Sequence, residues 1–194
     1  MFFGLINDLK FVPTYYTDTV FDVDYIKLYE KGIRLILTDL DNTLISYKES
    51  SPTLELYEWI KNRKEEGFEV IIVSNNSHKK RVKYFAEELG IKYTYLAAKP
   101  LKFGFRRALR KASRKYKRSE VVAIGDQMMT DVFIANRMKT ESILVKAIDR
   151  KTEIVTTRNN RRLEKKVLAN IKSKYPELYE EKLRRYKEEN HGRD

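Results

Sequence analysis

The chain of 194 residues contains no cysteine, only two histidines, seven glycines and four prolines. The absence of cysteine excludes disulfides and thiolate metal sites, and it fits a reducing, cytoplasmic location. No stretch approaches about eighteen consecutive apolar residues, so the sequence predicts no membrane-spanning helix. Residues 1–12 lack a basic leader and a small-residue cleavage site, so we expect no secretory signal. We expect His78 and His191 at the surface and assign them no role.

Basic residues are in excess: 40 lysines and arginines face 28 aspartates and glutamates, giving a net charge of +12. Hydrophobic residues make up 42 % of the chain, which excludes a wholly disordered protein. The positive charge favours an anionic partner, either a membrane surface or nucleic acid, and it does not distinguish between them. The densest basic segment, residues 102–118, carries nine lysines and arginines and no acidic residue.

Short apolar runs alternate with segments of helical periodicity along most of the chain. The runs predict strands at residues 33–37, 69–73, 91–96, 121–124 and 142–145. Alternation with short connections predicts an α/β fold, a Rossmann-like, doubly wound parallel sheet. The length fits a single domain, which we place at residues 1–174.

Within that domain we expect a helical lead (1–32), the sheet core (33–148) and a basic helix (149–174). In the lead, apolar residues at helical spacing predict a short helix that is either docked on the core or placed in a membrane interface: Phe2, Leu5, Ile6, Leu9 and Val12. Residues 175–194 are highly charged, and we expect a solvated helix or a frayed tail there.

Two carboxylates, Asp39 and Asp41, follow the first apolar run directly. In an extended chain they point the same way, because they are separated by one residue. Like charges so close are costly unless a cation or a shared proton compensates them. A solvated turn is the ordinary alternative for such a pair. The position at a strand end favours a functional site, since open parallel sheets place their chemistry there.

The other strand ends also carry polar residues. In chain order the four ends are Asp39-x-Asp41-x-Thr43, Ser74, Lys99 and Gly125-Asp126-x4-Asp131. This set resembles the four motifs of the haloacid dehalogenase-like (HAD) phosphohydrolase superfamily, over residues 33–145. The resemblance implies phosphoryl transfer, in which Asp39 is the nucleophile and Asp41 the general acid and base. It also implies that Lys99 contacts the phosphate.

The resemblance further implies a Mg²⁺ cofactor, because a hard cation compensates the carboxylates. Its ligands would be Asp39, the backbone carbonyl of Asp41, and Asp126, with Asp131 supporting the metal or pairing with Lys99. The phosphate would be bound by Thr43, Ser74, Asn75 and Lys99.

The intervals between the motifs are too short for a cap domain, with about thirty residues from Thr43 to Ser74 and about twenty-five from Ser74 to Lys99. An open site suits a phosphate carried on a large or membrane-anchored molecule. Further segments resemble the YqeG-type branch of subclass IIIA, up to about residue 172: 9–13, 38–44, 125–132, 135–137 and 157–164. One departure is Ala135, where that branch has glycine.

That closer resemblance implies a relative of the phosphatidylglycerophosphate phosphatases, which act in phosphatidylglycerol synthesis. We therefore expect a peripheral enzyme at the inner membrane face, with Arg137 and Arg158 as candidate headgroup contacts. Two alternatives stay open. One is a phosphatase of a soluble metabolite or a nucleic-acid end, and the other is an RNA- or ribosome-associated binding protein. The sequence shows no platform of interleaved aromatic and basic residues for stacking bases.

Overall fold

The structure is a computed structural model, and it describes residues 7–192. The sequence predictions at Phe2, Leu5 and Ile6 therefore lie outside the described residues. The described part of the lead begins with a short 3₁₀ helix, Asp8–Phe11. It continues through a strand, β1 (Tyr15–Thr17), and a helix, α1 (Tyr25–Glu30).

In the described part of the chain, six strands form one sheet in which every neighbouring pair is parallel, with the order β1-β6-β5-β2-β3-β4. The five that the sequence predicted are β2 (Leu35–Thr38), β3 (Glu69–Val73), β4 (Lys92–Thr94), β5 (Val121–Gly125) and β6 (Glu141–Val145). The predicted α/β parallel fold is thus confirmed. Strand β1 was not predicted, because it is three residues long, half-buried and lacks an apolar run.

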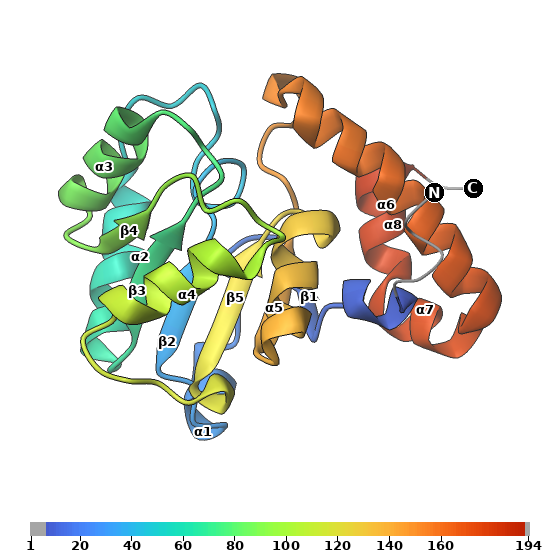
Figure 1. Cartoon of the computed structure of the whole chain (residues 1–194), viewed down its shortest axis with the longest axis horizontal. Coiled ribbons are helices and arrows are strands. Elements are labelled where there is room, and N and C mark those ends of the chain that lie inside the picture. The colour runs from blue at the N-terminus through green and yellow to red at the C-terminus, as the bar shows by residue number, and fades with distance from the viewer. Residues whose placement is uncertain (1–6, 193–194) are drawn as a thin grey trace.

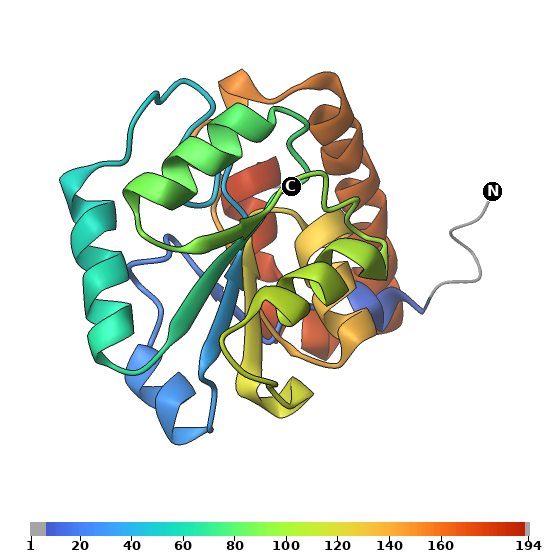
Figure 2. The ribbon, with the colours of Figure 1, turned by 60° about the vertical axis from the view of Figure 1, so that its left-hand side comes forward.

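Helices cover both faces of the sheet (Figures 1 and 2). One face packs against α1, α2 (Leu54–Glu65) and α3 (Lys79–Glu88), and the other against α4 (Lys102–Lys111) and α5 (Phe133–Met138). Alternate residues of β2 face the two layers: Ile36 lies in the first core, and Leu35 and Leu37 lie in the second. Strands that are buried on both faces need continuous apolar runs, which is the pattern that predicted them.

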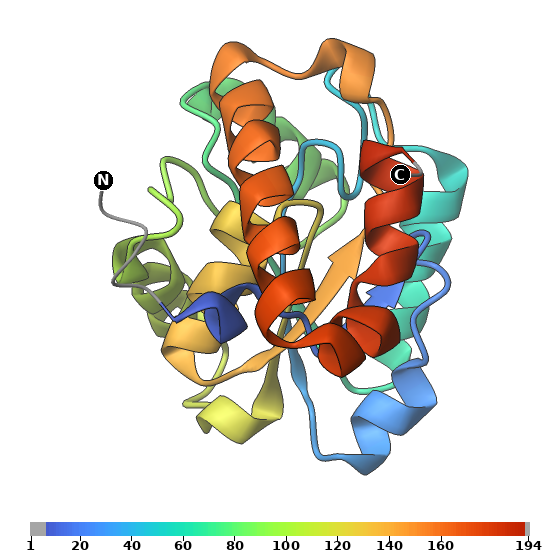
Figure 3. The same cartoon turned by 90° about the vertical axis from the view of Figure 1, so that its right-hand side faces the viewer.

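The remaining helices form a third packed group beside the sheet core. Helix α6 (Val155–Lys174) is long, and the chain then reverses into α7 (Pro176–Lys182) and α8 (Arg184–His191), which lie beside α6 (Figure 3). Their apolar side chains form one cluster with Phe11 of the lead and Leu144 of β6. The basic helix predicted at 149–174 is present, after a 3₁₀ turn at Arg150–Thr152.

The prediction of a solvated or frayed tail beyond Pro176 is wrong. Tyr179, Leu183 and Tyr186 are buried, Tyr186 completely. These residues recur at helical spacing, so one stripe of an otherwise charged segment is apolar and packs on α6. The surface assignment of His191 is wrong for the same reason, since its side chain is only 1 % exposed. His78 is exposed, as predicted.

Candidate active site

The predicted site residues follow four neighbouring strands at the same edge of the sheet. Because β2 lies between β3 and β5 in a parallel register, the segments that begin at Asp39, Ser74 and Asp126 emerge side by side. The Asp39 backbone N–H donates to the Ile124 carbonyl oxygen at 2.9 Å, which extends the pairing of β2 with β5 by one residue. Asp39 is therefore held by the sheet itself.

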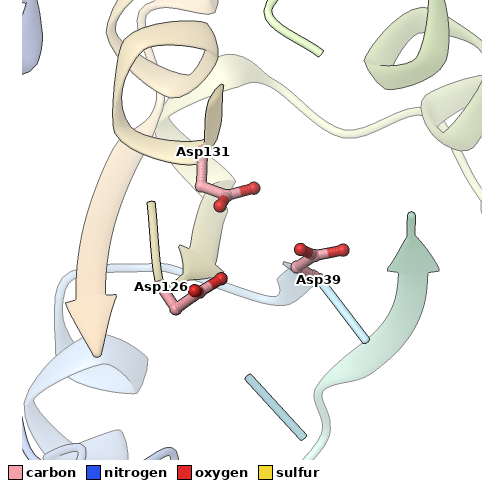
Figure 4. A group of neighbouring side chains, drawn as sticks. All are labelled: Asp39, Asp126 and Asp131. Atoms are coloured by element: carbon pink, nitrogen blue, oxygen red, sulfur yellow. The ribbon is translucent and has the colours of Figure 1, made fainter. Parts of the chain in front are cut away.

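Three buried carboxylates converge at this edge: Asp39, Asp126 and Asp131 (Figure 4). Each offers an oxygen that lies within 4.8 Å of the other two. Asp131 stands on a π-helical turn, Met128–Val132, and its Oδ2 accepts from the Gln127 backbone N–H at 3.2 Å. A glycine is required at position 125, because a Cβ there would overlap the Asp131 carboxyl group.

Lys99 neutralises part of this charge. Its Nζ lies 2.9 Å from Asp39 Oδ1 and donates to Asp131 Oδ1 at 2.7 Å, with the side chain almost fully buried. Burial alone would lower the pKa of Lys99, but the two carboxylates outweigh it and raise that pKa above its usual range. The Asn75 amide fixes the Lys99 backbone by accepting its N–H at 2.7 Å and donating to its carbonyl at 3.0 Å. Lys99 is thus a fixed cation at the strand ends and not a solvated lysine.

The acidic triad remains under-compensated. Burial raises the pKa of the Asp39 carboxyl to about 8, although Lys99 opposes the rise. Burial likewise raises the pKa of Asp126 to about 6, against the attraction of the Arg161 guanidinium. Three buried carboxylates therefore lack sufficient positive charge, and within residues 7–192 Asp39 Oδ1 has no hydrogen-bond donor in good geometry. A divalent cation with a preference for oxygen ligands fits this group, and Asp39, Asp126 and Asp131 could hold it.

Asp41 does not join the triad. Its Oδ1 accepts from Arg81 Nε at 3.1 Å, and its Oδ2 accepts from Asn76 Nδ2 at 2.8 Å. The Arg81 guanidinium also donates to the backbone carbonyls of Ser46 and Glu49, at 2.9 and 2.7 Å, so it ties the loop after β2 to α3. The sequence did not single out Arg81 or Asn76. Both carboxylates of the Asp39-x-Asp41 pair are in the site, but they have different partners.

A cleft of about 830 Å³ opens above these residues. Asp39, Asp41, Ser74, Asn75 and Lys99 all line it, together with residues from the first turns of α6. Ser74 Oγ accepts from the Asn76 backbone N–H at 3.0 Å, so its own hydrogen can be donated into the cleft. The cleft therefore brings together the predicted nucleophile and most of the predicted phosphate-binding groups.

The other predicted residues do not line the cleft. Thr43 is buried, and its Oγ1 donates to Asp126 Oδ1 at 3.3 Å. Arg137 donates to the Pro100 carbonyl at 2.8 Å, and Arg158 is exposed on α6. Among the described residues, the structure thus gives Thr43 a place beside the acidic triad, whereas Arg137 and Arg158 lie outside the cleft.

Arg161 is the main residue of the site that sequence reasoning missed. It lies within the basic helix predicted at residues 149–174, yet it is buried and its guanidinium contacts both the carboxylate and the backbone carbonyl of Asp126. The spacing of residues in the sequence does indicate that Arg161 is buried. Arg161, Glu164, Leu168 and Ile171 recur at helical spacing, which places Arg161 on the buried face of α6.

The raised pKa values predict how pH acts on the metal-free protein. Asp39 and Asp126 hold protons up to about pH 8 and 6 when folded, but they ionise near pH 4 when unfolded. The folded state therefore binds more protons between these limits, so its stability falls as pH rises through that window. We expect the melting temperature in EDTA to fall from pH 6 to 8 more steeply than that of Asp39→Asn. We expect Mg²⁺ to stabilise the wild-type protein more at pH 8 than at pH 6, because the ion replaces protons. Parallel pH profiles for both proteins in EDTA would contradict this prediction.

The chain is similar to several known proteins. Residues 19–138 match the family described as haloacid dehalogenase-like hydrolase. The chain is 40 % identical over 164 residues to the probable phosphatase YqeG of Bacillus subtilis, covering 84 % of this chain and 93 % of that protein. An uncharacterized protein from Listeria monocytogenes aligns with a TM-score of 0.50 and 20 % identity, over 63 % of this chain and 86 % of its own. A second uncharacterized protein, from Corynebacterium glutamicum, aligns with a TM-score of 0.49 and 18 % identity, over 61 % of this chain and 89 % of its own.

Proposed function

Because the chain belongs to the haloacid dehalogenase-like hydrolase family, we propose that it is a Mg²⁺-dependent phosphatase that works through an aspartyl-phosphate on Asp39. Its class, an HAD-type phosphatase, follows from the family and from the 40 % identity to a probable phosphatase. The observation that best supports the mechanism is the position of Asp39. It lies at the floor of an open cleft, 2.9 Å from the Lys99 ammonium and within the acidic triad.

In the first step an Asp39 carboxylate oxygen attacks phosphorus, and the bond from phosphorus to the leaving oxygen breaks. Asp41 supplies the proton that the leaving oxygen takes up. In the second step Asp41 accepts a proton from water, whose oxygen attacks phosphorus and releases phosphate and the Asp39 carboxylate. Arg81 and Asn76 occupy both oxygens of Asp41, so one of these contacts must be exchanged for the leaving group.

The charge on the transferred phosphoryl group is met by Lys99 and by the hydroxyl of Ser74, with Asn75 keeping Lys99 in place. Mg²⁺, when bound by Asp39, Asp126 and Asp131 and the backbone carbonyl of Asp41, supplies the remaining positive charge. Thr43 donates a hydrogen bond to Asp126, so it would help to orient this proposed metal ligand.

For the substrate we propose a phosphomonoester on an anionic lipid, most specifically phosphatidylglycerophosphate. The rim of the cleft supports this proposal because it carries exposed apolar residues on two sides. Leu96 and Ile154 line the cleft, and Leu101 and Phe103 follow the lining residue Pro100 with 59 % and 55 % of their surfaces exposed. Exposed apolar residues around a polar cleft are typical of contact with a membrane or another apolar partner.

Basic side chains lie among these apolar residues. The Arg107 guanidinium is 5.2 Å from the centre of the Phe103 ring, and Lys79 and Arg107 both lie 5.7 Å from the Tyr95 ring. Burial and the neighbouring charges of Arg107 and Lys79 lower the pKa of Lys111. Such crowding of positive charge is relieved beside an anionic membrane, where each cation contributes about 1 kcal/mol.

No helix within residues 7–192 is long and apolar enough to cross a bilayer. The proposed association is therefore peripheral, at the inner membrane face, and rests on the rim and the basic residues around it. Arg158 is exposed in the first turn of α6, and its backbone N–H donates to the carbonyl of the rim residue Ile154 at 3.0 Å, so it remains a candidate headgroup contact. Arg137 would first have to leave the Pro100 carbonyl.

The test of this function is phosphate release in the presence of Mg²⁺ from three substrates. These are phosphatidylglycerophosphate in mixed micelles, a soluble aryl phosphate and a 5′-phosphorylated RNA, with Asp39→Asn as the blank. We expect a strong preference for the lipid. Activity on the aryl phosphate or the RNA alone would retain the mechanism and reject the lipid. Salt-dependent RNA binding without turnover of any phosphate would favour an RNA-associated binding protein.

The rim predicts a specific effect on vesicle binding. We expect the double variant Leu101→Ser/Phe103→Ser to bind vesicles containing anionic lipid about 30-fold more weakly. Each side chain loses the transfer free energy of a partly exposed apolar group, about 1 kcal/mol. The measurement is co-sedimentation at two salt concentrations. Ile26→Ser is the matched control, since Ile26 is 75 % exposed on α1, at the opposite end of the molecule from the start of α6 (Figure 1). Equal losses in both variants would contradict a role for the rim.

A further inference from the structure

A buried ionic cluster contacts the acidic triad at Asp126. Its centre is Arg161 of α6, which pairs with Asp126, Glu153 and Glu164. Arg150 also lies 3.7 Å from Glu153, and His191 lies 3.4 Å from Glu164. Arg161 Nε donates to Glu153 Oε1 at 3.0 Å, and the guanidinium lies 3.3 Å from Glu164 Oε2. A buried arginine needs a hydrogen-bond acceptor for each of its donors, because burying an unpaired charge lowers the stability of the fold.

Helix α6 contacts the segment after β5 at several points. Arg161 donates from one nitrogen to the Asp126 backbone carbonyl at 2.7 Å and from another to its Oδ2. One turn further along α6, Glu164 Oε1 accepts from the Met128 backbone N–H at 2.8 Å. The segment that carries Asp126 is therefore held at its main chain as well as at its carboxylate, while Asp126 Oδ1 faces Thr43 at 3.3 Å.

The C-terminal helices complete the set of contacts around Arg161. The hydroxyl of Tyr186 in α8 accepts from Arg161 at 3.2 Å and donates to Glu164 Oε2 at 2.9 Å. Tyr186 is fully buried, and α8 lies beside α6 because α7 reverses the chain (Figure 3). One phenolic hydroxyl thus links two residues of α6 that contact the Asp126 segment.

From this geometry we propose that Arg161, held by Glu164 and Tyr186, is a positioning residue for Asp126, and that α7 and α8 are thereby part of the metal site. The inference rests on the proposed function in one respect, the role of Asp126 as a Mg²⁺ ligand. A planar guanidinium that donates to both the carbonyl and the carboxylate of one residue fixes its side-chain rotamer. Outer partners of this kind orient metal ligands and raise metal affinity.

Arg161 does not replace the metal. Its single positive charge is shared among the carboxylates of Asp126, Glu153 and Glu164. The Asp126 carboxylate therefore keeps net negative charge on the side of the triad. Arg161 orients this carboxylate and does not neutralise it. This distinction makes the proposal testable, because a lysine at position 161 preserves the charge but not the paired donors.

The experiment measures Mg²⁺ affinity by isothermal titration calorimetry and the melting temperature of the metal-free protein for three variants. Arg161→Lys is expected to weaken Mg²⁺ binding about 10- to 100-fold, the range found for outer-shell partners. Tyr186→Phe is expected to weaken it by a smaller factor. Tyr16→Phe is the matched control: it also removes a phenolic hydroxyl bonded to α8, at Glu189 Oε2, and its ring packs edge-on against Tyr186.

We expect only Tyr186→Phe to weaken Mg²⁺ binding, although both variants lose a hydroxyl that contacts another residue of the C-terminal helices or of α6. Equal Mg²⁺ affinity in Tyr186→Phe and the wild type, together with full affinity in Arg161→Lys, would overturn the inference. So would affinity losses that merely follow the loss of melting temperature in all three variants. Failure of the proposed function has a different signature, since the wild-type protein itself would then bind no Mg²⁺.

Discussion

Asp39→Asn is expected to lower kcat for every phosphomonoester by at least about 10⁴-fold, the scale seen when a covalent nucleophile is removed. An amide oxygen is a poor nucleophile, and the variant also loses a charged metal ligand. The fold should survive, because Asp39 is a buried carboxylate whose pKa is raised to about 8, so its ionisation opposes folding. We therefore expect the metal-free variant to melt no lower than the wild type at pH 8.

Detection of the covalent intermediate distinguishes the role of Asp39 as the nucleophile from its role as a metal ligand. Acid quenching during turnover of a phosphate-labelled substrate should leave label on the wild-type protein and none on Asp39→Asn. Asp126→Asn is the matched control, since it removes a proposed metal ligand and leaves the nucleophile. It is expected to retain a measurable, slowly formed label. Turnover by Asp39→Asn near the wild-type rate, or label on that variant, would show that another residue is the nucleophile.

Lys99→Met is expected to affect both stability and turnover. The ammonium lies between Asp39 and Asp131, at 2.9 and 2.7 Å, with all three groups buried. Removing one member of a buried ionic group leaves uncompensated charge, which typically costs about 3–5 kcal/mol of unfolding free energy. Turnover should fall about 10²–10³-fold, the range for loss of a donor to developing charge. Urea denaturation at pH 8 and steady-state kinetics measure the two effects.

A second substitution distinguishes the two effects of Lys99. Lys99→Met/Asp131→Asn removes one of the stranded carboxylates, so it should recover part of the lost stability at pH 8. It should not recover turnover, because the cation that faces the phosphate is still absent and because Asp131 is itself a proposed ligand of Mg²⁺. If the double variant regains activity along with stability, Lys99 acts only by maintaining the fold. If Lys99→Met is as stable as the wild type, the ion pairs with Asp39 and Asp131 contribute nothing to folding.

The sequence predicted the parts of this protein whose signals are local. Each central strand is an apolar run that ends in polar residues, and parallel strands bring their carboxyl ends to one edge. Asp39, Ser74, Lys99 and Asp126 could therefore be expected near one another before their positions were known. Strand β1 could not, because an edge strand of three half-buried residues has no such run.

The partners of the charged residues were decided only by the tertiary structure. Arg158, Arg161 and Arg162 stand on one basic helix, and only the packing of α6 over the segment after β5 buries Arg161 and leaves Arg158 exposed. Asp41 and Asp39 likewise differ because α3 brings Arg81 to one carboxylate and the loop after β4 brings Lys99 to the other.

The packing of the C-terminal segment, residues 175–192, also could not be predicted from the sequence. Tyr179, Leu183 and Tyr186 form an apolar stripe in a highly charged segment, and such a stripe stabilises a helix only against a complementary surface. That surface includes residues from α6, β6, the turn after β5 and the lead, which are far apart in sequence. Local patterns determined where the strands and the reactive carboxylates lie. The burial of one arginine, one tyrosine and the last two helices was decided by contacts between distant segments, because burial depends on what a side chain meets after the chain has folded.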